Sequence, residues 1–172
     1  EGIIPAELLK CNRSGKIGAN ETLPKIYWIK KNEPEVFAKT AKIFPAVQDY
    51  IIYKLTGIAA TEYSAAGNTT MMNVDHMTPD HTDWSEELMR YVGVTRDMMP
   101  EIHKRTDIIG EVPEKYAAEC GLAAGTKLVI GAGDTQCSMI GAGFIKPGDA
   151  YMNGGTSAGI LALSKERKML GG

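Results

Sequence analysis

An aspartate near the end of the chain follows a short apolar run, and its place suits proton transfer. The run 127–130 stands between Gly125 and Gly131, which predicts a buried strand. Asp134 comes next, and the segment 135–143 ends in glycines, which is typical of a short helix. A residue at such a strand-to-helix junction points into the cleft beyond the carboxyl end of the strand. There a carboxylate can accept the proton of an attacking hydroxyl group, as a catalytic aspartate does in phosphoryl transfer.

A corner of small residues follows further along the chain and suits the binding of an anion. Two mostly apolar segments, 150–153 and 158–163, flank this corner, which predicts a β-hairpin. Small residues let backbone N–H groups converge on an anion, and a Ser or Thr hydroxyl adds a donor without adding bulk. Gly155, Thr156 and Ser157 are therefore candidates for contacting the terminal phosphate of a nucleotide.

Each of these features has simpler interpretations that local sequence leaves open. Asp134 alone can be a helix N-cap, and the corner alone can be a tight turn. A dinucleotide-binding unit is disfavoured, because Gln136 occupies the third glycine of the GxGxxG pattern that begins at Gly131. Asp134 would also repel a pyrophosphate there. A non-catalytic binding domain is the remaining alternative.

Composition excludes several classes of protein. The 172 residues correspond to roughly one domain. They carry 19 Lys and Arg against 21 Asp and Glu without a block of like charge, which argues against a nucleic-acid partner. No apolar run approaches the roughly 18 residues that span a bilayer, so we expect no membrane partner. Cys11, Cys120 and Cys137 lack metal-ligand spacing, so we expect packing roles and a cytoplasmic location.

The rest of the chain predicts alternating helices and strands, and therefore an α/β fold. Helices are expected at 24–31, 34–42, 48–56, 83–92 and 114–120, and a strand at 107–112. The segment 61–74 is expected to be a strand or an extended loop. Gly57, Gly93 and Gly121 should end three of the helices, and Trp28 and Trp84 should anchor the core.

Four blocks, together with their order and spacing, resemble the FGGY family of carbohydrate kinases. They are QDYIIYKLTG (48–57), TEYSAAGNTTMMN (61–73), GAGDTQCSMIGAG (131–143) and YMNGGTSAG (151–159). Xylulokinases and glycerol kinases are the most similar types. The resemblance implies an actin-like ATPase (ribonuclease H-like) fold of two domains, with ATP and a sugar or polyol bound between them and Mg²⁺ assisting. It also allows a homodimer.

The resemblance assigns roles to individual residues. Asp134 matches the catalytic base, and Thr135 stands at the neighbouring position, where family members place a residue that touches the substrate. Gly155 and Thr156 match the pair that contacts the phosphates of ATP, and Ser157 stands where the family often has Gly. The implied activity is ATP-dependent phosphorylation, with xylulose as the expected substrate. Glycerol or another sugar, and a non-catalytic relative, are the alternatives.

Two motifs of the family are absent from this sequence. Neither the Asp-x-Gly-Thr phosphate motif nor the Gly-rich segment that contacts adenosine is present. We therefore expect the chain to be a central fragment that is inactive on its own. Residues 1–125 would be the later part of the sugar-binding domain, and residues 126–172 the start of the ATP-binding domain.

Overall fold

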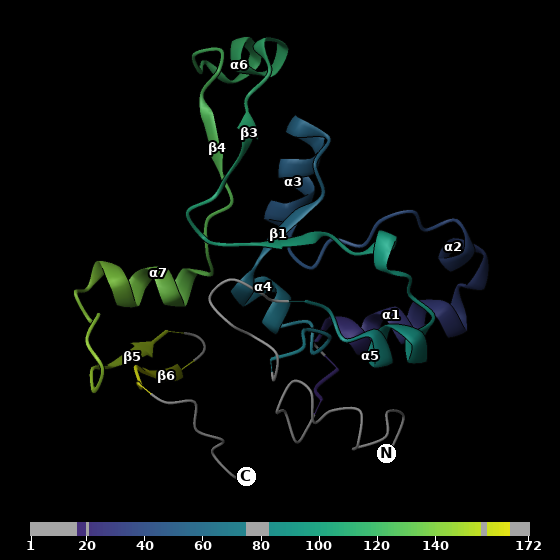
Figure 1. Cartoon of the computed structure of the whole chain (residues 1–172), viewed down its shortest axis with the longest axis horizontal. Coiled ribbons are helices and arrows are strands. Elements are labelled where there is room, and N and C mark those ends of the chain that lie inside the picture. The colour runs from purple at the N-terminus through teal and green to yellow at the C-terminus, as the bar shows by residue number, and fades with distance from the viewer. Residues whose placement is uncertain (1–16, 20, 75–82, 156–157, 166–172) are drawn as a thin grey trace. The chain divides into compact units, whose positions relative to one another are not determined.

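The structure is a computed structural model that describes residues 17–19, 21–74, 83–155 and 158–165 (Figure 1). The chain divides into two compact units, residues 1–131 and residues 132–172. The domain boundary expected near Gly125 stays a prediction, because a compact unit of this chain is not by itself a domain of a longer protein. None of the helices among the described residues is long and apolar enough to cross a membrane.

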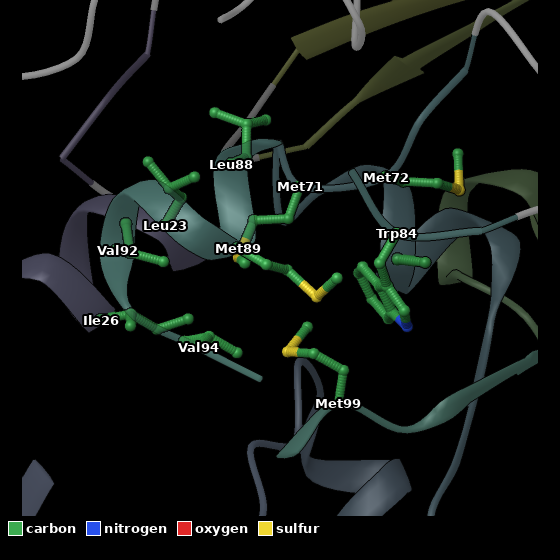
Figure 2. Packing of buried hydrophobic residues seen from close by; sticks show 11 residues of the cluster. Leu23, Ile26, Met71, Met72, Trp84, Leu88, Met89, Val92, Val94 and Met99 are labelled. Atoms are coloured by element: carbon green, nitrogen blue, oxygen red, sulfur yellow. The ribbon is translucent and has the colours of Figure 1, made fainter. Parts of the chain in front are cut away.

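Helices build the larger core of the first unit. It contains α1 (Thr22–Asn32), α2 (Pro34–Ala38) and α5 (Glu86–Val92), followed by the 3₁₀ helix η2 (Arg96–Met98). The buried cluster in Figure 2 consists of Leu23, Ile26, Ala66, Met71, Met72, Trp84, Leu88, Met89, Val92, Val94 and Met99. Trp84 is buried as predicted, and its Nε1 donates to the carbonyl oxygen of Pro100. Trp28 is 57% exposed, so its predicted core role is wrong.

The helix ends follow the predicted glycines. Gly57, Gly93 and Gly121 all adopt positive φ directly after α3 (Val47–Thr56), α5 and α6 (Glu114–Cys120), as helix C-terminal residues without a Cβ can do. The predicted helix 34–42 is shorter and ends at Ala38. The chain leaves the helix there and continues to Ile43, whose N–H donates to the carbonyl oxygen of Met98.

The segment 61–74 differs from the expected strand or loop. Strand β1 (Ala60–Glu62) pairs in parallel with β2 (Glu101–His103), and the chain then turns into the short helix α4 (Tyr63–Gly67). The carboxylate of Glu62 accepts hydrogen bonds from the backbone N–H groups of Ser64 and Ala65 and so caps α4. This cap is a buried Glu and not one of the usual capping residues, so the sequence did not predict the helix.

The pair of strands before the second unit is antiparallel. Strand β3 (Ile108–Glu111) pairs with β4 (Lys127–Val129), and α6 lies between them in the chain (Figure 1). The expectation of a buried strand at 127–130 is wrong in part, since Lys127 and Val129 are exposed while Ile130 is buried. One face of this pair packs against α3, so only alternate residues are covered.

The second unit begins with a helix and ends with a hairpin. Helix α7 (Asp134–Gly141) is followed by β5 (Ala150–Gly154) and β6 (Ala158–Ala162), which pair antiparallel as predicted. The rings of Phe144 and Tyr151 lie 5.9 Å apart between their centroids, so the segment after α7 contacts β5.

Candidate functional site

Asp134 is the first residue of α7, at the strand-to-helix junction that the sequence predicts. Gly131 adopts a φ of +80°, a left-handed conformation that favours glycine, and the chain then enters the helix through Gly133. Gly133 is the N-cap residue, so the alternative in which Asp134 is the N-cap is wrong. The side chain of Asp134 is exposed. Its carboxylate is therefore accessible to solvent in this chain.

Thr135 holds this carboxylate in place. Its backbone N–H donates to Oδ1 of Asp134 at 2.7 Å, and its Oγ1 hydroxyl lies 3.3 Å from the same oxygen. Two donors on one oxygen restrict the rotation of the carboxylate. Thr135, the neighbour of Asp134 in the chain, thus also contacts its side chain, while the roles of both residues stay predictions.

The rest of α7 anchors the site. Met139 is buried, and the carbonyl oxygen of Met139 accepts a hydrogen bond from the N–H of Phe144. Cys137 is exposed one turn after Asp134, and Cys120 at the end of α6 is also exposed. The expected packing role of these two cysteines is therefore wrong, and Cys11 lies outside the described residues.

The predicted phosphate-binding corner is described only in part. Gly155 is exposed and follows β5 directly, in the same compact unit as Asp134. Gly154 and Ala158 are paired across the hairpin, so the corner lies between the two strands as expected. Thr156 and Ser157 lie outside the described residues.

Among the described residues, no three His, Cys, Asp or Glu side chains are grouped so as to hold a metal ion. Mg²⁺ commonly binds to one or two carboxylates together with substrate phosphates and water, rather than to a cage of protein ligands. The single exposed carboxylate of Asp134 is compatible with that arrangement.

A buried polar cluster in the first unit was not predicted from the sequence. Asp49 is fully buried in α3, and its Oδ2 accepts hydrogen bonds from Thr61 Oγ1 (2.9 Å) and from the N–H of Ala46 (3.0 Å). Burial, with a smaller contribution from the nearby Glu62, raises the pKa of Asp49 to about 6 despite the lowering effect of these two bonds. The sequence contained one signal for the burial of Asp49. It lies three residues before the apolar and buried Ile52, and this spacing puts both residues on one helix face.

A groove in the first unit contains none of the predicted site residues. Its volume is about 750 Å³, and it is lined by Lys42, Ile58, Ala59, Arg96, Asp97, Met99 and Glu101. Lys42 Nζ donates to the carbonyl oxygen of Asp97, and Arg96 forms an ion pair with Asp83. Lys42 and Arg96 therefore each have a partner, a backbone carbonyl oxygen for Lys42 and a carboxylate for Arg96.

Known proteins resemble this chain over most of its length. The sequence model of the "FGGY family of carbohydrate kinases, N-terminal domain" matches residues 9–141. The xylulose kinase of Bacillus subtilis is 35% identical over 147 residues, which are 86% of this chain and 28% of that protein. The autoinducer-2 kinase of Klebsiella pneumoniae is 32% identical over 143 residues, which are 83% of this chain and 26% of that protein.

The fold has solved counterparts as well. The crystal structure of ligand-bound xylulose kinase from Lactobacillus acidophilus superposes with a TM-score of 0.75 at 29% sequence identity. The match covers 83% of this chain and 28% of that one. The chain thus spans about a quarter of the length of the relatives it matches.

Proposed function

Because this chain belongs to the FGGY family of carbohydrate kinases, we propose that the protein transfers the γ-phosphoryl group of ATP to a hydroxyl group of a sugar or polyol. The observation that carries the proposal is the carboxylate of Asp134, exposed at the start of α7 and held by Thr135. A carboxylate in that position can receive the proton of the attacking hydroxyl.

Each part of the site would contribute to one step of the reaction. The substrate hydroxyl attacks the γ-phosphorus, its proton passes to Asp134, and the bond from the γ-phosphorus to the bridging oxygen breaks to release ADP. Thr135 orients the carboxylate for that transfer through its two contacts with Oδ1. The backbone at Gly155, with Thr156 and Ser157, would contact the phosphates of ATP. Mg²⁺ bound with ATP would neutralise charge that develops on the phosphates.

Xylulose is the substrate that we propose. The relatives in Bacillus subtilis and Lactobacillus acidophilus are named as xylulose kinases, and the first has the higher sequence identity of the two. A homodimer and a cytoplasmic location stay predictions, as does the division into a sugar-binding part, 1–125, and the start of an ATP-binding domain, 126–172.

A second candidate substrate is the one used by autoinducer-2 kinases. Several bacterial proteins of that name match more than four-fifths of this chain, at identities of 27% to 32%. Thr135, beside the base, is the residue of the described site that would help to choose between these substrates.

The proposed function is tested by ADP release. A full-length protein that contains this chain is given Mg-ATP with xylulose, ribulose, gluconate, rhamnulose or glycerol, or with autoinducer-2, beside Asp134→Asn. We expect release with one compound and a loss of at least 1000-fold in the variant, since the amide that replaces the carboxylate is not a base. The control is Asp149→Asn, which keeps the side-chain oxygen that accepts the N–H of Lys146.

Either of two results contradicts the proposal. Full turnover by Asp134→Asn excludes that residue as the base. No release with any compound by a folded wild-type protein contradicts these substrates, and it favours first a kinase of another substrate and then the non-catalytic alternative.

A further inference from the structure

The C-terminal end of α7 is closed by a Schellman motif that ties Phe144 to the helix. Gly143 follows the helix at a φ of +83°, and its N–H donates to the carbonyl oxygen of Ile140 at 2.9 Å. The N–H of Phe144 donates to the carbonyl oxygen of Met139 at 3.1 Å. These are the two backbone hydrogen bonds that define the motif. Phe144 is therefore held against the last turn of the helix that begins at Asp134.

Tyr151 contacts this helix end from the β-hairpin of the same compact unit. The centroids of the Tyr151 and Phe144 rings lie 5.9 Å apart, and the ring planes are inclined at 56°. Separations of about 4.5–7 Å are typical of favourable aromatic pairs. Tyr151 pairs with Leu161 across the hairpin and is half-buried, whereas its neighbours Ala150 and Met152 are exposed on the other face. The more covered face of the hairpin is thus the one that meets Phe144.

The chain between the two aromatic residues belongs largely to the hairpin. The N–H of Gly148 donates to the carbonyl oxygen of Leu163, and the N–H of Leu163 donates to the carbonyl oxygen of Asp149, both at 2.9 Å. These bonds extend the ladder of β5 and β6 back to Gly148. A short link, residues 145–147, then joins the hairpin to Phe144. The ring contact adds a second connection beside this covalent link, and so restricts the rotation of α7 about it.

We propose that Tyr151 is a positioning residue for phosphoryl transfer, because its ring sets how α7 lies against the hairpin. The inference rests on the proposed function. Asp134, the proposed base, is the first residue of α7, and Gly155, which would contact the phosphates of ATP, directly follows β5. Tyr151 therefore controls the distance between these two residues, through Phe144 and α7 on one side and through β5 on the other.

The test compares variants of a full-length protein that contains this chain. Tyr151→Ala and Phe144→Ala each remove one ring of the pair, the double variant removes both, and Tyr151→Phe keeps the ring. Tyr50→Ala is the matched control, because the rings of Tyr50 and Phe44 lie 5.8 Å apart in the first compact unit, which does not contain Asp134. The kcat and the KM values for ATP and sugar are measured, together with hydrogen exchange at the Phe144 amide.

The expected result is a loss of kcat that the two rings share. A displacement of about 1 Å in a catalytic group can lower a rate on the order of 100-fold, and the loss of one contact between intact elements should cost about tenfold. Tyr151→Ala and Phe144→Ala should each show this loss with both KM values unchanged. The double variant should also lose about tenfold rather than 100-fold, because both residues act through one contact.

The other measurements separate this role from a general effect on folding. The Phe144 amide should exchange about tenfold faster in Tyr151→Ala, because the ring that packs on the helix end is gone. Tyr151→Phe and Tyr50→Ala should stay within about twofold of the wild type in kcat, since the first keeps the ring pair and the second removes a pair remote in the fold from α7.

Several outcomes would overturn the inference. They are an unchanged kcat or an unchanged Phe144 exchange rate in Tyr151→Ala, losses that multiply in the double variant, or an equal loss in Tyr151→Phe or Tyr50→Ala. If Tyr151→Ala fails to fold, Tyr151→Val, which suits a strand, is held to the same criteria. If the wild-type protein releases no ADP, the failure lies with the proposed function, and exchange at the Phe144 amide then tests the ring contact by itself.

Discussion

Ionisation of the buried Asp49 lowers the stability of the folded protein. Burial raises its pKa to about 6 from an ordinary value of 3.8, so the folded state binds the proton more tightly than the unfolded chain does. The folded state is therefore favoured by protonation. This contribution is complete below about pH 4 and is lost as the pH rises through about 6.

Replacement of Asp49 should change the pH dependence of stability. We expect the free energy of unfolding of the wild type to contain a term that falls between about pH 4 and 6, and Asp49→Asn to lack this term. Urea denaturation at a series of pH values measures it. Asp97→Asn is the control. The hydroxyl of Thr95 holds the pKa of Asp97 below its usual value, so the contribution of Asp97 to stability rises with pH instead of falling. An identical pH profile for Asp49→Asn and the wild type would refute the assignment.

The position of a residue was predicted where local sequence determines it. Asp134 begins α7 as expected, because glycines and an apolar run define that junction, while the roles of Asp134 and Thr135 stay predictions. Trp28 was misjudged, and the burial of Asp49 was not predicted, because exposure depends on which distant segments pack over a residue. Nothing within a few residues of Asp49 reports that Thr61 will lie against it.

Among the helices, α5 depends on a cap that one substitution can test. Oγ of Ser85 accepts a hydrogen bond from the N–H of Leu88, at 3.3 Å, and Ser85 is buried. Ser85→Ala should lower the free energy of unfolding by about 1 kcal/mol, measured by urea denaturation. Ser85→Gly should cost only a few tenths of a kcal/mol, because the smaller residue is a better N-cap than Ala. Equal stability of wild type and Ser85→Ala would contradict the role of this hydroxyl.

Elements were predictable where their ends carry a local signal. Glycines that end a helix act through their own φ, so α3, α5 and α6 end as expected. Helix α4 was missed because its cap, Glu62, is a buried carboxylate whose partners include Arg105 from a distant turn, which local sequence does not reveal. The parallel pairing of β1 with β2 joins segments about 40 residues apart, and no local pattern specifies such a partner.

For the molecule as a whole, the actin-like ATPase fold that the sequence predicted is confirmed by the match to a solved xylulose kinase at a TM-score of 0.75. The resemblance between the four motif blocks and the family carried this prediction, since composition alone indicated only an α/β protein. The exposed faces of the strand pairs, such as that of β3 and β4, were not predicted. Which face of a strand is covered depends on the segments that pack against it.

The core of the first unit should dominate its stability. Leu88 is fully buried within the cluster of Figure 2, whereas Val36 is 57% exposed. Leu88→Ala should lower the free energy of unfolding by about 2–5 kcal/mol, because it leaves a cavity in a packed core. Val36→Ala should change it by no more than about 0.5 kcal/mol. Calorimetry of both variants measures the difference, and similar unfolding temperatures would show that this cluster is not the core.

The two exposed thiols have a practical consequence. Cys120 belongs to the first compact unit and Cys137 to the second, one turn after Asp134. With Cys11 replaced by Ser, a maleimide dye or a nitroxide spin label on each thiol would place one reporter on each unit at native positions. Energy transfer or electron–electron dipolar coupling between the two labels would then report on any change in the distance between the two units when nucleotide or sugar is added.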